Sequence, residues 1–402
     1  MSLRILHIST RLIVGGSQEN TILSCEGQTE LGHEVHLAYG PIYGPEGSML
    51  DRVQAFRSAD GRAITAHEVP DMVRELSPLR DRRCLKQLIA LIEDLQPDIV
   101  HTHSSKAGIL GRIAAWKAGG AAGRLGVVHT VHGPPFHRYE KKSRNIVYIS
   151  AERAAARRCH AIISVADAMT EQFCSAGIGT PQQFVTVRSG METGPYLAPI
   201  ADDERAKQRK ALGLNANDVV IGTVSRLSDL KGHDDLVEAF APLLRDRPEL
   251  KLLWVGDGWL RESLEKRLCD LGLRERVVIT GMVPPQEVPG LMKLMDILVH
   301  PSYREGLPRA VVQAMLCGLG VIATDVDGTK EVCVDQQTGL LIPSGDPSAL
   351  RDGVRRMLEE PQNRARYGEA ARAHCQDAFS AERMVSDLEA VYARVLEGLR
   401  GH

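Results

Sequence analysis

Short runs of apolar residues, rich in Val and Ile, alternate along the chain with longer stretches of helical periodicity. In the first half the runs are RILHIS, EVHLAY, DIVHTH, GVVHTV, AIISV and FVTVR, and in the second half they are DVVIGTVS, KLLWVG, RVVITG, DILVHP, GVIATD and GLLIP. Continuous apolar strands that alternate with helices indicate parallel sheets covered on both faces. Six runs in each half predict an α/β fold of two doubly wound domains instead of one large sheet.

The domain boundaries follow from where this alternation stops. We expect an N-terminal domain over residues 1–190, a linker region over 191–216 and a C-terminal domain over 217–378. The linker region combines Gly, Pro and mixed charges and has no strand-like run. A last helical pattern covers 380–400, and its spacing alone leaves open the domain on which it packs.

Composition narrows the class of protein. The 402 residues carry a formal net charge of −2, which argues against a general nucleic-acid binder. No apolar run approaches the roughly 18–20 residues that span a bilayer, and the N-terminal MSLRILHISTR is typical of a first strand and not of a signal peptide. Eight cysteines without a CxxC pair support neither a zinc site nor a disulfide framework. This cysteine usage predicts a cytoplasmic location.

Polar and glycine-rich segments follow several of the predicted strands. Ligands of open α/β sheets bind outside the carboxyl ends of the strands, so we expect a site in a cleft between two such edges. Gly15 and Gly16 follow the first strand and lead into a helix, where free amides favour an anion; a simple tight turn is the alternative. The segment is not GxGxxG, and no acidic residue ends EVHLAYG, which excludes a typical nicotinamide-binding domain.

Histidines end two of the predicted strands in the first half. His101 and His103 are spaced i, i+2, with Lys106 just beyond them, and His132 precedes a Gly-Pro-Pro turn. The first two could bind a metal ion, but no carboxylate or third ligand accompanies them, so we expect no metal site. A histidine at a strand end suits hydrogen bonding to substrate hydroxyls or to developing charge. A packed histidine remains the alternative for His132, and more so for His101.

Basic residues follow the first strand of the second half. Arg226 ends the run IGTVSR, and Lys231 stands beside a glycine where a helix begins. Two fixed cations beside a helix N-terminus suit a diphosphate. Gly256 and Met282 follow the next two strands, where backbone groups could recognise a base or simply form a turn.

The segment REGLPRAVVQAM joins another strand to a helix. Pro308 suits a helix start, which leaves Glu305 in the preceding loop with Gly306 and Leu307. Gln313 lies inside the helix on an otherwise apolar face. It is either a ligand contact or a structural hydrogen-bonding residue.

These motifs, taken in order and spacing, carry a family resemblance. The segments GGSQE, HTHSSKAGILGR, TVHG, SRLSDLKG, VGDG, HPSYREGLPRAVVQAM and TGLLIP resemble the retaining GT-B glycosyltransferases of family 4 over essentially the whole chain. The resemblance implies two Rossmann-like domains facing across a cleft, with a nucleotide-sugar donor on the C-terminal one and an acceptor on the N-terminal one. It also implies that no metal or other cofactor is required and that the last helix crosses back to the first domain.

The resemblance also assigns roles to particular residues. Arg226 and Lys231 match the pair that holds the donor diphosphate, and Glu305 matches the first glutamate of the E-x7-E motif, which contacts the sugar. His132 matches the histidine near the transferred sugar. Gly15 and Gly16 match the loop that approaches the donor phosphates and the acceptor. We expect His103 and Lys106 on the acceptor side and Gly256, Met282, Gly306, Leu307 and Gln313 on the donor side.

Three positions depart from the family pattern. Gln313 stands where the second motif glutamate holds the ribose hydroxyls, and loss of that charge weakens the contact by about 1 kcal/mol, or roughly five- to tenfold in affinity. Arg188-Ser189-Gly190 replaces a common Pro-Asn-Gly, and Gln18 stands where a glutamate is frequent.

The resemblance predicts a retaining, metal-independent hexosyltransferase of surface-glycan or exopolysaccharide synthesis. Its leaving diphosphate would help to deprotonate the acceptor hydroxyl. Two alternatives are a sugar-nucleotide epimerase or hydrolase on the same fold and a non-catalytic nucleotide-sugar binding protein. The basic stretch 136–158 could hold the protein at the inner face of a membrane that carries a lipid-linked acceptor, or it could be a solvated helix face.

Overall fold

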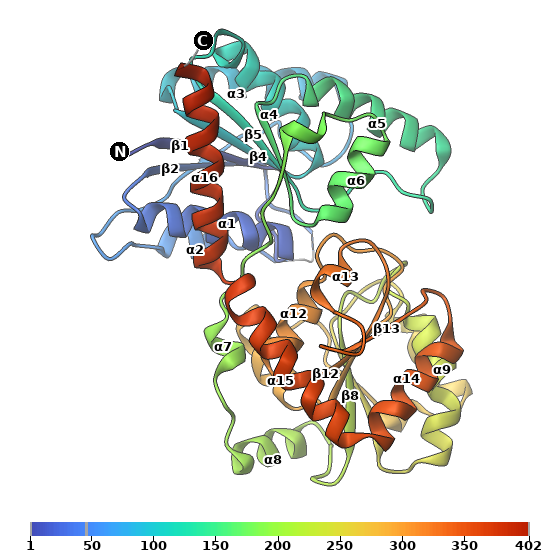
Figure 1. Ribbon diagram of the computed structural model, residues 1–402. Helices are drawn as coiled ribbons and strands as arrows, with labels where there is room; N and C mark the ends of the chain where they lie inside the picture. The colour runs from blue at the N-terminus through green and yellow to red at the C-terminus, as the bar shows by residue number, and fades with distance from the viewer. Residues whose placement is uncertain (1, 45–46, 401–402) are drawn as a thin grey trace. The chain divides into compact units, whose positions relative to one another are not determined.

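The computed structural model describes residues 2–44 and 47–400, and the chain forms two compact units (Figure 1). The first unit comprises Met1–Met191 and Ala381–His402, and the second comprises Glu192–Ser380. The chain thus leaves the first unit once and returns to it for its last helix. The two crossing points are joined by a hydrogen bond of 3.1 Å from the Ala381 backbone N–H to the Met191 carbonyl oxygen.

The first unit contains a seven-stranded sheet in which every pair of neighbouring strands is parallel, in the order β3-β2-β1-β4-β5-β6-β7. Its strands are β1 (Arg4–Ser9), β2 (Glu34–Tyr39), β3 (Thr65–Glu68), β4 (Ile99–His103), β5 (Gly126–Val131), β6 (Ala161–Ser164) and β7 (Phe184–Thr186). The register places His7 of β1 beside His101 of β4. The hydrophobic runs predict six of these strands but miss β3, a partly exposed edge strand whose sequence, TAHE, contains only one apolar residue.

Helices cover both faces of this sheet. They are α1 (Gly16–Glu30), α2 (Leu50–Ala55), α3 (Pro78–Leu95), α4 (Ser105–Ala118), α5 (Lys142–Ala156), α6 (Asp167–Ser175) and α16 (Ala381–Arg400). The last of these, α16, packs against α1 and β5 (Figure 1). Its apolar face shares a buried core with strands β1, β4, β5 and β6, in which Leu388, Val391 and Val395 pack with residues such as Ile5 and Val128. This burial holds α16 to the first unit.

The second unit repeats the plan with six parallel strands in the order β10-β9-β8-β11-β12-β13. Its strands are β8 (Val219–Val224), β9 (Leu250–Val255), β10 (Val277–Ile279), β11 (Ile297–His300), β12 (Gly320–Thr324) and β13 (Leu340–Ile342). Its helices are α7 (Gly194–Leu197), α8 (Asp202–Ala211), α9 (His233–Asp246), α10 (Arg261–Asp270), α11 (Val288–Lys293), α12 (Arg309–Leu316), α13 (Thr329–Val332), α14 (Pro347–Glu359) and α15 (Pro361–Ala378). All six strands of this sheet correspond to hydrophobic runs.

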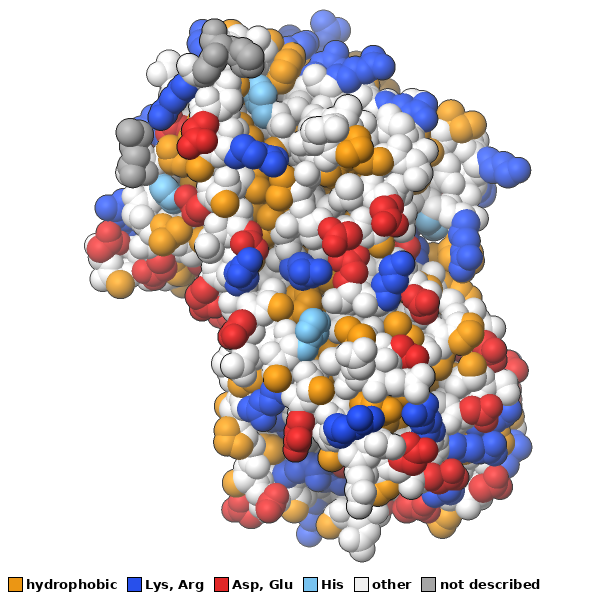
Figure 2. Space-filling model, viewed as in Figure 1, with side chains coloured by type: hydrophobic (Ala, Val, Ile, Leu, Met, Phe, Trp, Pro, Cys, Tyr) orange, Lys and Arg blue, Asp and Glu red, His pale blue; other side chains and the backbone are white. Residues whose placement is uncertain are grey.

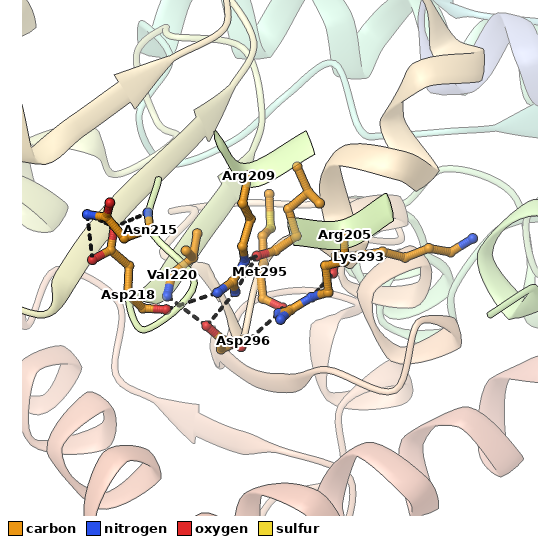
Figure 3. Close-up of polar contacts among 9 residues, drawn as sticks. Arg205, Arg209, Asn215, Asp218, Val220, Lys293, Met295 and Asp296 are labelled. Atoms are coloured by element: carbon orange, nitrogen blue, oxygen red, sulfur yellow. Dashed lines mark hydrogen bonds and ion pairs between the residues drawn. The ribbon is translucent and has the colours of Figure 1, made fainter. Parts of the chain in front are cut away.

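The predicted linker region 191–216 contains α7 and α8, and α8 is fixed to the second sheet. The carboxylate of Asp296, just before β11, accepts a hydrogen bond of 2.9 Å from Arg205 and one of 2.8 Å from Arg209 (Figure 3). The same carboxylate accepts the Val220 backbone N–H at 2.8 Å. The side chain of Arg209 is only 3% exposed, so removal of Asp296 would leave a buried cation unpaired.

Each sheet reverses its strand order once, between β1 and β4 in the first unit and between β8 and β11 in the second. Such a switch point is where open α/β sheets bind ligands, because the loops that leave the two strands run in opposite directions. The loops after these four strands carry most of the residues that the sequence singles out. Within residues 2–44 and 47–400, no helix has the length and hydrophobicity needed to cross a membrane.

Candidate functional site

The switch point of the second unit brings Lys231 and Glu305 together. Lys231 follows β8 and Glu305 follows β11, and Lys231 Nζ donates to Glu305 Oε1 at 2.6 Å. The same oxygen is 2.9 Å from Nε2 of His300, the last residue of β11. Two residues that are expected separately at the phosphate and at the sugar are therefore ion-paired with each other.

The surroundings of Glu305 keep its carboxylate ionised. Burial alone would raise the pKa of Glu305, but the charge of Lys231 and the hydrogen bond from His300 outweigh it and hold the pKa well below its usual range. The Glu305 backbone N–H also donates to Asp327 Oδ2 at 2.7 Å, which fixes the loop between β11 and α12. Neither His300 nor Asp327 is predicted from the sequence. His300 could have been found from its position, because it ends the apolar run of β11 just as His103 ends that of β4.

Arg226 stands at the same edge as Lys231. Its side chain is exposed and has no ion pair within the described ranges. Lys231 is followed by Gly232, which precedes α9 and has a φ of +73°. A Cβ at that position would lie 2.1 Å from the Pro301 carbonyl oxygen, so the loops after β8 and β11 can approach closely only because Gly232 is glycine. No side chain caps the N-terminus of α9, and its amides are available to an anion.

Gly256 and Met282 lie after β9 and β10, at the neighbouring positions of this edge. Gly256 has a φ of +141°, and a Cβ there would lie 2.1 Å from the Ser225 carbonyl oxygen. Glycine at 256 is therefore required by contact between two loops, whether or not a ligand also approaches it. The side chain of Met282 is 54% exposed.

Gln313 lies in α12, beyond the loop that carries Gly306 and Leu307. The Leu307 side chain is buried, and Gln313 is partly buried. In the described part of the chain the Gln313 side chain makes no hydrogen bond, so its amide is available to a ligand. No partner was found there for the alternative role of Gln313 as a structural hydrogen-bonding residue.

In the first unit, the loop after β1 is tied to the loop after β4. Thr10 Oγ1 lies 2.7 Å from Ser104 Oγ and accepts the Ala107 backbone N–H at 3.2 Å. Gly15 precedes α1, whose first residue is Gly16, and no side chain caps this helix N-terminus. This geometry agrees with the predicted approach of an anion, whose binding stays a prediction.

Histidines meet at the switch point of the first unit. His103 Nδ1 lies 3.2 Å from His132 Nε2, which brings the two predicted residues into contact. The sequence shows no third ligand beside His101 and His103, but the pairing of β1 with β4 brings His7 to them. Nitrogens of these three buried side chains lie within 4.8 Å of one another and could hold a metal ion. Every one of the six nitrogens, however, has a hydrogen-bonding partner.

Lys106, predicted on the acceptor side, is ion-paired in this structure. Its ammonium lies 2.5 Å from Asp81 Oδ1 of α3 and also donates to the Glu75 carbonyl oxygen. The side chain is only 11% exposed. An acceptor contact through Lys106 would have to share its ammonium with these two oxygens.

Two family models match the chain on either side of its first crossing point. The model described as Glycosyltransferase Family 4 matches residues 14–193, and the model described as Glycosyl transferases group 1 matches residues 204–374. The first match includes His103, Lys106 and His132, and the second includes Arg226, Lys231 and Glu305.

Relatives and solved structures agree with these matches. The chain is 31% identical over 301 residues to the Escherichia coli UDP-Gal:alpha-D-GlcNAc-diphosphoundecaprenol alpha-1,3-galactosyltransferase, which covers 74% of this chain and 76% of the relative. It is 30% identical over 321 residues to the 2-deoxystreptamine glucosyltransferase of Streptomyces kanamyceticus. This match covers 78% of this chain and 81% of the relative. The crystal structure of Anabaena HepE in complex with UDP and glucose has the same fold, with a TM-score of 0.80, 21% identity and coverage of 98% and 100%.

Proposed function

The chain belongs to the GT-B glycosyltransferases of family 4 and uses a nucleotide-sugar donor, and we propose that it transfers a hexose from a uridine diphosphate sugar to an acceptor hydroxyl with retention of anomeric configuration. The contact between Lys231 and Glu305 carries the proposal. In this contact a cation that suits a diphosphate lies beside an ionised carboxylate that suits sugar hydroxyls, at the switch point of the sheet, and this supports the proposal. The E. coli relative supports uridine as the base.

The protein's contribution to the reaction is to stabilise charge. As the bond from the sugar to the diphosphate breaks, negative charge develops on the leaving group, and Arg226, Lys231 and the amides of α9 would stabilise it. Lys231 would exchange its contact with Glu305 for one with a phosphate oxygen. Glu305 would then hydrogen-bond to sugar hydroxyls, and the leaving diphosphate would accept the proton of the acceptor hydroxyl. These protein cations take the role that a divalent ion has in metal-dependent transferases, and we propose that no metal is needed.

The test is a screen of UDP-, GDP- and ADP-hexoses for thermal stabilisation, followed by a nucleoside-diphosphate release assay with and without EDTA. We expect one uridine donor to raise the melting temperature and to be slowly hydrolysed in both conditions. The anomeric coupling constant of the transferred sugar should match that of the donor. Inversion of the anomeric centre would refute the retaining mechanism. Donor binding without release, even with saccharide or lipid-linked acceptors added, would identify a binding protein instead.

We further propose that the acceptor is carried on a lipid in the synthesis of a surface glycan and that α5 contacts the membrane. The E. coli relative acts on a diphosphoundecaprenol-linked sugar. The α5 residues Ile146 and Val147 are 66% and 56% exposed, and Lys141, Lys142 and Arg144 are exposed nearby. Figure 2 shows Lys and Arg side chains among hydrophobic ones on the surface of the first unit, in the region where Figure 1 places α5. Apolar residues flanked by cations are typical of helices that bind anionic lipid surfaces.

Sedimentation with vesicles tests this contact. The protein should bind phosphatidylcholine vesicles that contain about one third phosphatidylglycerol, and each basic residue near the surface should add about 1 kcal/mol. Ile146→Glu/Val147→Glu should abolish binding but leave donor hydrolysis unchanged. The control Leu31→Glu changes an exposed apolar residue that lies after α1. Equal binding of wild type and the double variant would refute the proposal for α5.

A further inference from the structure

Five side chains in the first unit form one continuous chain of hydrogen bonds that reaches from Glu389 to His132. Glu389 of α16 lies 3.3 Å from the Gln28 amide nitrogen of α1, and Gln28 Oε1 lies 2.7 Å from His7 Nε2. His7 Nδ1 lies 2.9 Å from His103 Nε2, and His103 Nδ1 lies 3.2 Å from His132 Nε2. Gln28, His7 and His103 are at most 1% exposed. Water therefore has little access to these three side chains, which form the middle of the hydrogen-bonded series.

The Glu389 end has a fixed direction. An ionised carboxylate only accepts hydrogen bonds, so the Gln28 amide must turn its nitrogen to Glu389 and its oxygen to His7. The second carboxylate oxygen of Glu389 lies 2.8 Å from His33 Nε2. His33 Nδ1 accepts the Leu3 backbone N–H at 3.0 Å, so the hydrogen of the His33 ring is on Nε2 and is donated to Glu389. Both oxygens of Glu389 thus accept hydrogen bonds from fixed donors.

The donor and acceptor at each step along the histidines are then fixed as well, because each neutral imidazole ring has only one N–H. Burial lowers the pKa of His7 to about 4 and, with the neighbouring histidines, lowers that of His103 well below its ordinary value, so both are neutral near pH 7. Gln28 Oε1 requires the hydrogen of His7 on Nε2. His7 Nδ1 then accepts from His103 Nε2–H. His103 Nδ1 is left to accept from His132 Nε2–H.

We propose that Glu389 is a positioning residue that, through Gln28, His7 and His103, holds the hydrogen of His132 on Nε2. The nitrogen with the lone pair in neutral His132 is then Nδ1, which can accept a hydrogen bond from a hydroxyl but cannot donate one. The consequence for catalysis rests on the proposed function and on the family resemblance, which implies that His132 lies near the transferred sugar. The tautomer of His132 follows from the four contacts above, all of which lie within the first unit.

The substitution Glu389→Gln should reverse the direction of all four hydrogen bonds between residue 389 and His132, and it should preserve the shape of the side chain at 389. His33 still donates, so the carboxamide of the substituted residue turns its oxygen to His33 and its NH₂ group to Gln28. Gln28 must then accept from it and donate to His7 Nε2. His7 and His103 would now carry their hydrogens on Nδ1, and His132 Nε2 would become an acceptor. The hydrogen of His132 moves to Nδ1, four hydrogen bonds from the substituted atom.

Long-range proton–nitrogen NMR spectra of the full chain labelled with ¹⁵N-histidine measure this directly, because protonated and unprotonated ring nitrogens have well separated shifts. A spectrum of His132→Asn assigns His132. We expect the hydrogen on Nε2 in the wild type and on Nδ1 in Glu389→Gln. The control Glu397→Gln makes the same change at an exposed position of α16, and its spectrum should be the same as that of the wild type. A wild-type hydrogen on Nδ1, or no change in Glu389→Gln, would overturn the inference.

Two further measurements separate stability and catalysis from the tautomer. If Glu389→Gln does not fold, Gln28→Leu interrupts the same chain and should give a mixture of both His132 tautomers; a single Nε2 tautomer there would also overturn the inference. In the folded Glu389→Gln variant we expect kcat to fall about 100-fold with little change in donor KM, since a wrong histidine tautomer is costly to enzymes that depend on it. A reversed tautomer with unchanged transfer would uphold the role of Glu389 and refute that of His132 at the sugar.

Discussion

Replacement of Lys231 by methionine should affect stability and donor binding for two different reasons. Lys231 Nζ and Glu305 Oε1 are 2.6 Å apart, and their side chains are 29% and 11% exposed. Lys231→Met therefore removes the cation from a carboxylate that remains largely buried. Glu305 keeps its hydrogen bond with His300, which limits the loss.

The magnitude follows from the geometry. At an effective dielectric constant of about 20, two charges 2.6 Å apart attract by about 6 kcal/mol, and most of this offsets the cost of desolvation. Because Lys231 is partly exposed, we expect Lys231→Met to cost about 2 kcal/mol of unfolding free energy, or about 4–8 °C in the melting temperature of a unit of this size. Loss of a charge-assisted contact to phosphate should weaken nucleoside-diphosphate binding by about 10- to 100-fold.

The double variant Lys231→Met/Glu305→Gln separates the two effects. It leaves no unpaired charge, so its stability in denaturant titrations should return to within about 1 kcal/mol of wild type, whereas its diphosphate binding in calorimetric titrations should stay weak. Glu305→Gln alone releases Lys231 and should bind the diphosphate at least as well as wild type. Lys207→Met is the control and should change neither quantity, because the Lys207 side chain is 80% exposed in its ion pair with Glu204 of the same unit. Wild-type diphosphate affinity in the double variant would refute the phosphate role of Lys231.

Three other outcomes are expected. Gln313→Glu should tighten uridine-diphosphate binding about five- to tenfold in calorimetry, because an ionised carboxylate holds ribose hydroxyls more strongly; weaker binding would place Gln313 elsewhere. Asp296→Ala should lower the unfolding free energy of the second unit by about 3 kcal/mol, because buried Arg209 loses its partner; a loss below about 1 kcal/mol would contradict this. Burial lowers the pKa of His7 from 6.5 to about 4, so the unfolded chain binds more protons between these values. The stability of the first unit should therefore be full above about pH 6.5 and fall toward pH 4, by up to about 3 kcal/mol from His7, in denaturant titrations across that range; a flat profile would contradict this.

The strands could be predicted because burial on both faces imposes a simple pattern on the sequence. The run GVVHTV coincides with β5, and EVHLAY coincides with β2. The missed strand β3 lies at an edge, where partial exposure permits TAHE and leaves no hydrophobic run. The two helices within 191–216 were missed for a related reason, since α8 is held by charged side chains and not by an apolar face.

The site could be predicted one residue at a time, but its contacts could not. Lys231 and Glu305 each follow a strand and stand beside a helix start, which marks them separately, whereas their ion pair depends on β8 and β11 being neighbours. Gln28 and Glu389 carry no local signal at all. They are 361 residues apart, and only the return of α16 brings them together. The roles of the individual residues in binding stay predictions.

The return of α16 also affects the order in which the protein can be completed during synthesis. A ribosome makes residues 192–380 before Ala381–Arg400, so the first unit lacks the helix that covers Ile5 and Val128 until the second unit has emerged. Domains usually fold in the order in which they are synthesised. In this chain the second unit is the first to have all of its residues, because the first unit still needs α16. A nascent chain would therefore expose the apolar surface under α16 throughout synthesis of the second unit, and a chaperone that binds such surfaces should bind the first unit.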